Sequence, residues 1–73
     1  MFTPYQPVES SAISAVAYDD DRHELTIRYV SGEAYIYFDV QPEEYADLVS
    51  AESKGRYVNL EIKPHHDFRH ASL

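Results

Sequence analysis

The chain has no cysteine and no tryptophan, only two glycines, and few basic residues among its 73 positions. Without cysteine it can form neither a disulfide framework nor a cysteine-based zinc site, and it lacks a thiolate nucleophile, which fits a reducing cytoplasm. No apolar run approaches the roughly 20 residues of a membrane span, and no basic segment with an apolar core marks a signal peptide. We therefore expect a cytoplasmic protein that makes no contact with membranes.

The charge balance is strongly acidic, with 13 Asp and Glu residues against six Lys and Arg residues and a formal net charge of -7. Broad electrostatic binding to DNA requires a basic face, so this composition excludes it. The charge is uneven along the chain, because residues 53 to 73 hold four basic side chains and two carboxylates. A selective contact with RNA through the last third of the chain is therefore still compatible with the composition.

The length allows one domain with a single small core, since a chain of this size buries only about 60% of the surface that it exposes when unfolded. Residues 1 to 9 contain Pro4 and Pro7, which predict an irregular head. Residues 10 to 63 carry the patterns of strands and helices and form the predicted domain. Residues 64 to 73 are expected to be a polar C-terminal tail.

Three strands are predicted in the first half of the domain, and two of them form a hairpin. Apolar residues alternate with more polar ones from residue 25 to residue 30, which is the period of a half-buried strand. Ser31 and Gly32 then predict a tight turn, and residues 33 to 39 resume strand character. A further strand is expected before the hairpin at residues 12 to 18, which are small, β-branched or aromatic. These strands would form an antiparallel meander.

The register of the hairpin decides which side chains are exposed. If the turn contains only Ser31 and Gly32, the position numbers of paired residues sum to 63, and the alternating apolar residues form one face suited to a core. The same register places Arg28 beside Tyr35 and Tyr37 on the other face, as a cationic and aromatic surface. A slip of one residue would exchange the two faces.

Two short helices are predicted after the sheet. Pro42 suits the first helical position, and the two glutamates that follow it interact favourably with the helix dipole. Apolar residues three and four positions apart give this helix one buried stripe, and it ends near residue 51. Ser53 predicts the cap of a second helix, which Gly55 weakens and Pro64 ends. The expected fold is α+β, in the order β-β-β-α-α, with both helices on one face of the meander.

Several short motifs follow one another in an order that is similar to a known family. They are Ser10-Ser11-Ala12-Ile13, Tyr18-Asp19, Ser31-Gly32, Tyr35-Ile36-Tyr37, Ala51 to Tyr57, Asn59 and Ile62-Lys63. Their order resembles the KTSC domain, which occurs at the C-terminus of some lysyl-tRNA synthetases and as stand-alone small bacterial proteins. The resemblance implies a small α+β domain without established activity, and it suggests RNA binding. The chain departs from the family pattern at Val58, where phenylalanine is usual, and at residues 64 to 67.

We predict a non-enzymatic binding module with two alternative partners. RNA or a ribonucleoprotein could stack bases on Tyr35 and Tyr37 while basic side chains meet phosphates. Alternatively, the same exposed sheet face binds another protein or a second copy of the chain as a dimer. The expected contact residues are Arg28, Tyr35, Tyr37, Lys54, Arg56 and Lys63. A simpler interpretation is that the tyrosines pack against the head or tail and the cations are solvated.

No catalytic, cofactor, metal or small-molecule site is predicted. The serines lie at predicted caps and turns, without a histidine and an acid at the spacing of a triad. His65, His66 and His70 could bind a metal ion, but a chain end rarely orients such ligands. Residues 19 to 21 lack the ligand set of a calcium loop. Asn59, within an apolar stripe, is expected to bond the backbone, with reading of a base edge as the alternative.

Overall fold

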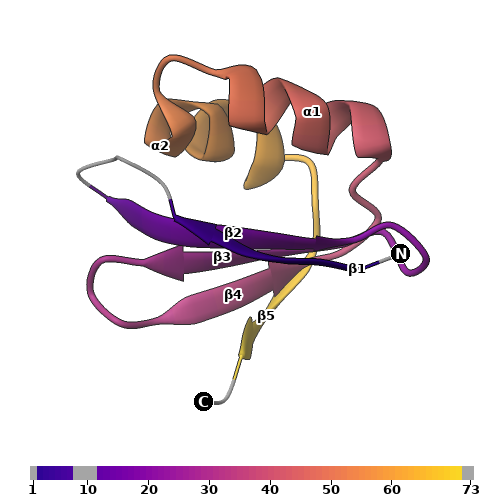
Figure 1. The fold of residues 1–73 in the computed structure, drawn as a ribbon, viewed down its shortest axis with the longest axis horizontal. Coiled ribbons are helices and arrows are strands. Elements are labelled where there is room, and N and C mark those ends of the chain that lie inside the picture. The colour runs from indigo at the N-terminus through magenta and orange to yellow at the C-terminus, as the bar shows by residue number, and fades with distance from the viewer. Residues whose placement is uncertain (1, 8–11, 72–73) are drawn as a thin grey trace.

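The structure is a computed structural model that describes residues 2 to 7 and 12 to 71, with side chains from residue 12 onward. A five-stranded antiparallel sheet carries a helical layer on one face (Figure 1). The strands are β1 (Phe2–Pro7), β2 (Ile13–Asp19), β3 (Glu24–Tyr29), β4 (Ala34–Tyr37) and β5 (Phe68–Ala71), in that order across the sheet. The helical layer consists of α1 (Pro42–Ser50), α2 (Lys54–Tyr57) and the π-helical turn η1 (Val58–Ile62). None of these helices is long and apolar enough to cross a membrane.

The α+β class and the helices on one face are confirmed, but the sheet has two strands more than the predicted meander. The head was expected to be irregular, yet it supplies β1, which pairs with the edge of β2. Pro4 coincides with an irregularity of this pairing, and proline is tolerated in an edge strand because only one side of that strand needs ladder donors. The tail supplies β5, which pairs with β4. Because β5 is short and lacks apolar alternation, its sequence carries no strand signal.

The turn between β3 and β4 contains three residues rather than two. The Tyr29 amide donates to the Glu33 carbonyl oxygen at 2.8 Å, and the Gly32 amide donates to the Tyr29 carbonyl oxygen at 2.9 Å. Val30 and Ser31 complete the turn, and Gly32 has a φ of 97°, in the left-handed region that glycine adopts without strain. This combination is the usual form of a three-residue hairpin loop.

The longer turn makes the predicted register wrong by one residue. Leu25 pairs with Tyr37, and Ile27 pairs with Tyr35, so paired position numbers sum to 62. Each side chain of β4 therefore points to the face opposite to the one predicted. Tyr37 is buried and packs in the core. The exposed Tyr-x-Tyr surface expected on the open face of the sheet does not exist.

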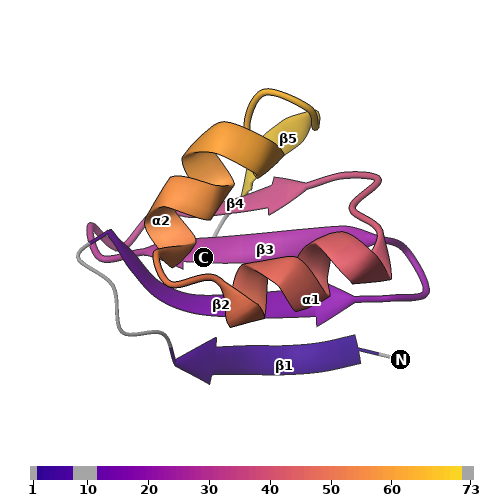
Figure 2. The ribbon, with the colours of Figure 1, turned by 90° about the horizontal axis from the view of Figure 1, so that it is seen from above.

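The core lies between the sheet and the helical layer, which covers the middle strands of the sheet in Figure 2 and leaves β1 uncovered. Its fully or nearly fully buried side chains are Ile13, Val16, Tyr18, Leu25, Ile27, Tyr37, Val40, Leu48, Val58 and Ile62. Tyr18 of β2 stacks on Tyr45 of α1, with ring centroids 4.7 Å apart and planes 8° from parallel. The Tyr18 hydroxyl also donates to the Val40 carbonyl oxygen at 2.6 Å. One tyrosine thus anchors both the entry to α1 and its buried face.

The predicted helix signals are largely confirmed. Pro42 is the first residue of α1, and the Ser53 hydroxyl accepts a hydrogen bond from the Arg56 amide at 3.2 Å at the start of α2. Gly55 lies inside α2, which forms despite the poor helix propensity of glycine. Asn59 is exposed on η1, and the described residues show no hydrogen bond from its side chain to the backbone. The alternative, in which Asn59 reads a base edge, stays a prediction.

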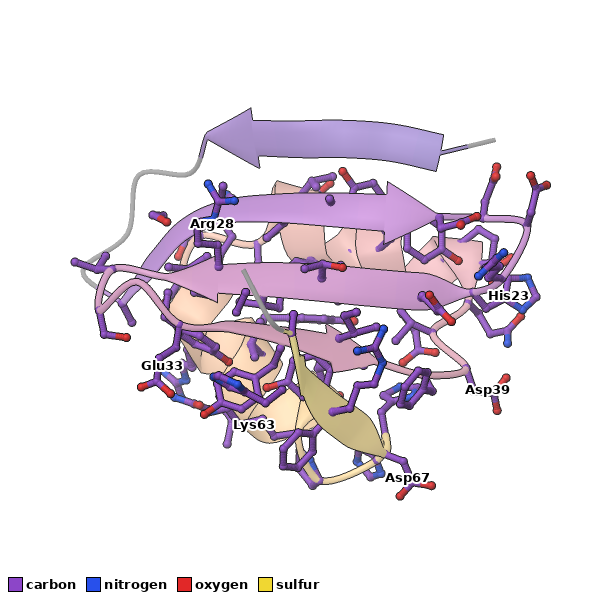
Figure 3. The ribbon with its side chains drawn as sticks, turned by 90° about the horizontal axis from the view of Figure 1, so that it is seen from below. His23, Arg28, Glu33, Asp39, Lys63 and Asp67 are labelled. Atoms are coloured by element: carbon purple, nitrogen blue, oxygen red, sulfur yellow. The ribbon has the colours of Figure 1, made fainter. Side chains whose placement is uncertain are left out.

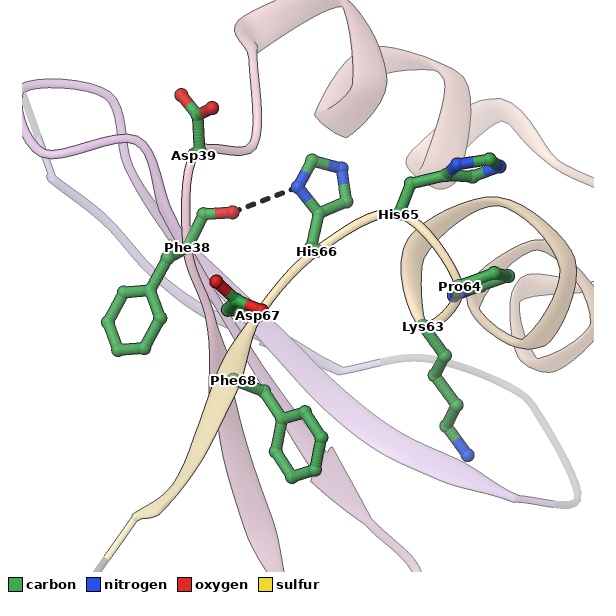
Figure 4. A pocket seen from close by; sticks show the side chains of 8 residues that line it. All are labelled: Phe38, Asp39, Lys63, Pro64, His65, His66, Asp67 and Phe68. Carbon is green, nitrogen blue, oxygen red and sulfur yellow. Dashed lines mark hydrogen bonds between the residues drawn. The ribbon is translucent and has the colours of Figure 1, made fainter.

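The segment between η1 and β5 is fastened to the rest of the protein by His66 (Figure 4). His66 Nδ1 lies 2.9 Å from the Phe38 carbonyl oxygen, and His66 Nε2 lies 2.6 Å from Glu44 Oε2. Both partners are acceptors, so a ring nitrogen that carries a proton donates to the oxygen it faces. The other carboxylate oxygen of Glu44 accepts a hydrogen bond from the Gln41 amide at 3.1 Å, at the start of α1. Glu44 therefore connects the helix terminus to the segment that leads into β5.

We predict that Tyr18→Phe lowers the free energy of unfolding by about 1 to 2 kcal/mol, because it leaves the buried Val40 carbonyl without this donor. Urea unfolding measures the change. The control is Tyr45→Phe, which keeps the ring stack and removes a hydroxyl that has no hydrogen-bond partner among the described residues. Equal effects of the two substitutions would show that the Tyr18 hydroxyl does not stabilise the fold.

We also predict an acid-sensitive contribution from Glu44. Partial burial acts to raise the pKa of Glu44, but hydrogen bonds from the Gln41 amide and from His66 outweigh it and lower that pKa below its usual value. A lowered folded-state pKa stabilises the fold above the unfolded-state pKa, and this stability is lost as the pH falls through the folded-state pKa. The free energy of unfolding should therefore fall more steeply between about pH 5 and pH 3 in the wild type than in Glu44→Gln.

Chemical denaturation at several pH values tests this prediction. Glu43→Gln is the matched control, since it removes the same charge from an exposed position in the same helical turn. Its pH profile should follow that of the wild type. A Glu44→Gln profile that also follows the wild type contradicts the role assigned to Glu44.

Candidate functional site

The corrected register gathers aromatic side chains at one end of the helix-covered face. Tyr35 of β4 pairs with His70 of β5, and Tyr37 pairs with Phe68, so these four side chains share a face with the core. Tyr29, at the end of β3, lies beside them and packs partly against the core. This part of the sheet lies toward β5, next to the end of η1 (Figure 2).

Tyr35 is at the centre of this aromatic group. Its ring meets Tyr29, Phe68 and His70 edge-on, at centroid distances of 5.7, 5.6 and 4.9 Å. Phe68 also contacts the Tyr37 ring at 5.8 Å, while 57% of Phe68 remains exposed. Edge-to-face contacts of this kind hold rings in fixed orientations. The group therefore combines well-supported tyrosines with one ring available to a ligand.

Lys63 brings a positive charge to the aromatic group. It directly follows η1, and its ammonium lies over the Tyr29 ring, 5.4 Å from the centroid. In Figure 4 the side chains of Lys63 and Phe68 lie on one side of the segment that leads into β5, and the Phe38 ring lies on the other side. Such a cation is attracted by the electron-rich ring face.

Two hollows meet at these residues. One, of about 270 Å³, is lined by Tyr29, Tyr35, Tyr37, Lys63 and Phe68. The other, of about 440 Å³, is lined by Ala12, Tyr29, Val30, Ser31, Glu33, Tyr35 and Lys63. Because they share Tyr29, Tyr35 and Lys63, we treat them as two lobes of one aromatic groove, with Phe68 in one lobe and Glu33 in the other. Their size is appropriate to a small ligand or to part of a larger one.

The hydroxyl groups of Tyr29 and Tyr35 stay protonated at neutral pH. Burial raises the pKa of Tyr29, and the hydrogen bond between the Tyr29 and Tyr37 hydroxyls, 3.0 Å apart, raises it further. The hydrogen bond to Glu33 is the largest cause of the raised pKa of Tyr35. Its hydroxyl donates to Glu33 Oε2 at 3.2 Å. The groove thus presents neutral rings, one ammonium and one carboxylate.

The structure brings together only three of the six predicted contact residues, namely Tyr35, Tyr37 and Lys63. Arg28 lies on the face of the sheet without helices, which is the face seen in Figure 3. Lys54 donates to the Ala51 carbonyl oxygen at 2.8 Å, close to the end of α1. Arg56 is exposed on α2 and lines a separate hollow. The six predicted contact residues therefore do not form one continuous surface.

Four residues of the site were missing from the predicted set: Tyr29, Glu33, Phe68 and His70. Tyr29 was assigned to the core, and the last two lay in the expected tail. The spacing of Phe68 and His70 is that of neighbours on one face of a strand, which is the only sequence signal that could have placed them together. Glu33 can be placed at the site only when the turn is known to contain three residues.

The predicted absence of a metal site concerned the tail histidines and residues 19 to 21. His66 contacts Phe38 and Glu44, and His70 Nε2 lies 3.3 Å from Glu33 Oε2. In the described part of the chain, only the carboxylates of residues 19 to 21 place three potential ligand oxygens within 4.8 Å of one another. Asp19 Oδ1 there accepts hydrogen bonds from two following amides, as in an ordinary turn.

Comparisons with known proteins agree with the resemblance seen in the sequence. Residues 9–66 match the KTSC domain family. A protein of Tsukamurella paurometabola is 51% identical over 59 residues, which cover 81% of this chain and 88% of that protein. An uncharacterized protein of Stutzerimonas stutzeri is 36% identical over 59 residues, covering 81% and 83% of the two chains. A lysine–tRNA ligase of Nostoc punctiforme is 38% identical over 69 residues, which cover 94% of this chain but 12% of the ligase.

A solved structure of the same family has the same fold as this chain. The crystal structure of a KTSC domain protein from Yersinia pestis superposes with a TM-score of 0.92 at 32% sequence identity, covering 99% of this chain and all of the other. Both the family match and this superposition extend over most of the residues that form the sheet and the helical layer. The chain belongs to the KTSC domain family.

Proposed function

We propose that this domain is a non-enzymatic binding module that holds a short single-stranded segment of RNA in the aromatic groove. The observation that carries the proposal is the position of the Lys63 ammonium over Tyr29, in a groove whose other wall is the exposed ring of Phe68. An unpaired nucleotide joins a planar base to a negative phosphate. Aromatic rings can stack on the base, and a cation beside them can bind the phosphate.

A relative supports RNA as the partner. The chain is similar to 12% of a lysine–tRNA ligase, whose name states that it acts on tRNA. RNA is therefore the first candidate ligand for a domain carried by such an enzyme. The proposal keeps RNA or a ribonucleoprotein as the expected partner and moves the contact from the open face to the helix-covered face of the sheet.

The charge of the chain limits how this binding works. With a net charge of -7, the domain repels phosphates over most of its surface. Lys63 is the lysine that lines the groove, while Lys54 and Arg56 lie outside it. Affinity must therefore come mainly from stacking, at roughly 1 to 3 kcal/mol per base. Few phosphates are contacted, so the affinity should depend only weakly on salt.

We predict that a labelled RNA of about eight nucleotides binds at low salt with a log–log salt slope of about -0.7 to -1.4, as expected for one or two phosphate contacts. Lys63→Met keeps the aliphatic stem over Tyr29 and should reduce the slope by about 0.7 and weaken binding. Fluorescence anisotropy over a salt series measures both quantities.

The matched control is Arg56→Gln, which removes the same charge from an exposed position that lines a different hollow. It should leave the slope unchanged. Phe68→Leu keeps an apolar side chain but no ring, and it should weaken binding at every salt concentration. If the wild type binds no RNA at low salt, the proposed function is wrong. If it binds and Lys63→Met behaves like Arg56→Gln, the groove is not the site.

The open face of the sheet supports self-association as a second candidate function. The helical layer covers only the other face (Figure 1). The register places Arg28, Ile36 and Arg69 on this open face, between alanines and a threonine, so that the face carries positive charge in an acidic protein. An acidic surface of a second copy of the chain, whose net charge is -7, would complement that charge.

We predict that, if this face forms a dimer, light scattering gives a mass that rises with protein concentration and that Arg69→Glu suppresses the rise. Arg69 is exposed, so the substitution should not affect the fold. Arg56→Glu on α2 is the control. A monomer mass at high micromolar concentration contradicts the dimer.

A further inference from the structure

Glu33 is a carboxylate held in a defined position at the aromatic groove. Its backbone is fixed by the hydrogen bond from the Tyr29 amide that closes the turn before β4. Its side chain accepts one hydrogen bond, from the Tyr35 hydroxyl to Oε2 at 3.2 Å. His70 Nε2 lies 3.3 Å from the same oxygen. These two contacts favour one position of the Glu33 carboxylate before a ligand binds. Glu33 and Lys63 line the same lobe of the groove, and Figure 3 labels both residues.

The carboxylate can still accept hydrogen bonds. Both side-chain contacts use Oε2, and a carboxylate offers about four lone-pair positions. The Glu33 side chain is 56% exposed at the lobe that it shares with Tyr29, Tyr35 and Lys63. The side of Glu33 that faces the groove is therefore an acceptor of fixed position, and it selects ligands with hydrogen-bond donors.

The groove is not suited to a simple ion. Aromatic rings and a carboxylate together can hold a cation, but the Lys63 ammonium already lies over Tyr29 and repels a second one. An anion alone is repelled by Glu33. A ligand that fits has a planar ring for the aromatic side chains, donors for Glu33 and a negative group for Lys63, and a nucleotide has all three.

We infer that the aromatic groove prefers guanine, whose Watson–Crick edge is bound by the Glu33 carboxylate. Guanine presents two adjacent donors, N1–H and the N2 amino group, which a carboxylate accepts together. Adenine and cytosine offer one amino group beside a ring nitrogen that repels the carboxylate, and the single N3–H of uracil lies between two carbonyl oxygens. The inference rests on the proposed RNA binding and adds base selectivity at the same site.

The test compares oligouridines that differ at one central base. In the wild type, one guanosine should tighten binding about five- to tenfold over all-uridine RNA, at the lower end of the range for paired hydrogen bonds because Glu33 is partly exposed. Inosine keeps N1–H but lacks the N2 amino group, so it should recover only part of this gain. This comparison needs no variant and does not depend on folding of a mutant.

The variant Glu33→Gln tests whether Glu33 causes the preference for guanine. It should lower the guanosine-to-uridine affinity ratio to near one, because the amide presents a donor in place of one acceptor. Removing a negative charge strengthens phosphate binding for all the RNAs alike, so the ratio is the readout. Glu61→Gln is the control, with the same change of charge at an exposed position on η1, and it should keep the wild-type ratio.

The outcomes separate the inference from the function on which it rests. A wild-type ratio near one, with RNA bound, overturns guanine selectivity and leaves RNA binding intact. A raised ratio that Glu33→Gln does not change overturns the role of Glu33. If no RNA binds at low salt, both the proposed function and the inference are wrong.

Discussion

The hydrogen bond from the Tyr29 amide to the Glu33 carbonyl is the constraint on which the rest of the structure depends. It closes a three-residue turn, which Gly32 permits through its positive φ. The turn sets the register, and the register decides which face of the sheet receives Tyr35 and Tyr37. Shortening it by one residue would move both rings to the uncovered face and leave the core without Tyr37. Fold and candidate site therefore have the same origin.

Five of the tyrosines form two groups: one packs α1 against the sheet, and the other lines the aromatic groove. Tyr18 and Tyr45 stack beneath α1 and fasten it to the sheet. Tyr29, Tyr35 and Tyr37 form the floor of the aromatic groove, at the other end of the helical layer. The groove is complete only because β5 adds Phe68 to the edge of β4, and β5 is reached through a segment that His66 attaches to Glu44 of α1. A contact at the start of one helix thus helps to position a side chain of the site.

The sequence predicted the elements with strong local signals and missed those decided by pairing. Alternation marked β3, and Pro42 and Ser53 marked the helix starts, since these features depend on neighbouring residues. The turn length could not be predicted, because Ser31-Gly32 suits a loop of two residues or of three. β1 and β5 form because β2 and β4 offer unpaired edges, a property of the folded sheet rather than of the segments themselves. Lys63, Tyr35 and Tyr37 were found by residue type, whereas Phe68 and Glu33 required the corrected register.

The acidity of the chain determines what kind of binding the groove can support. A protein with a net charge of -7 gains little from counterion release, which supplies most non-specific affinity for nucleic acids. What remains is stacking on a few rings, one ammonium and one oriented carboxylate, and these contacts depend on the identity of the base more than on the phosphate chain. Repulsion from the rest of the surface lowers the affinity for every RNA by a similar factor. Under the proposed function, the ratio of affinities for two bases is therefore unchanged, but the affinity for a ligand that lacks the right base falls below a useful level.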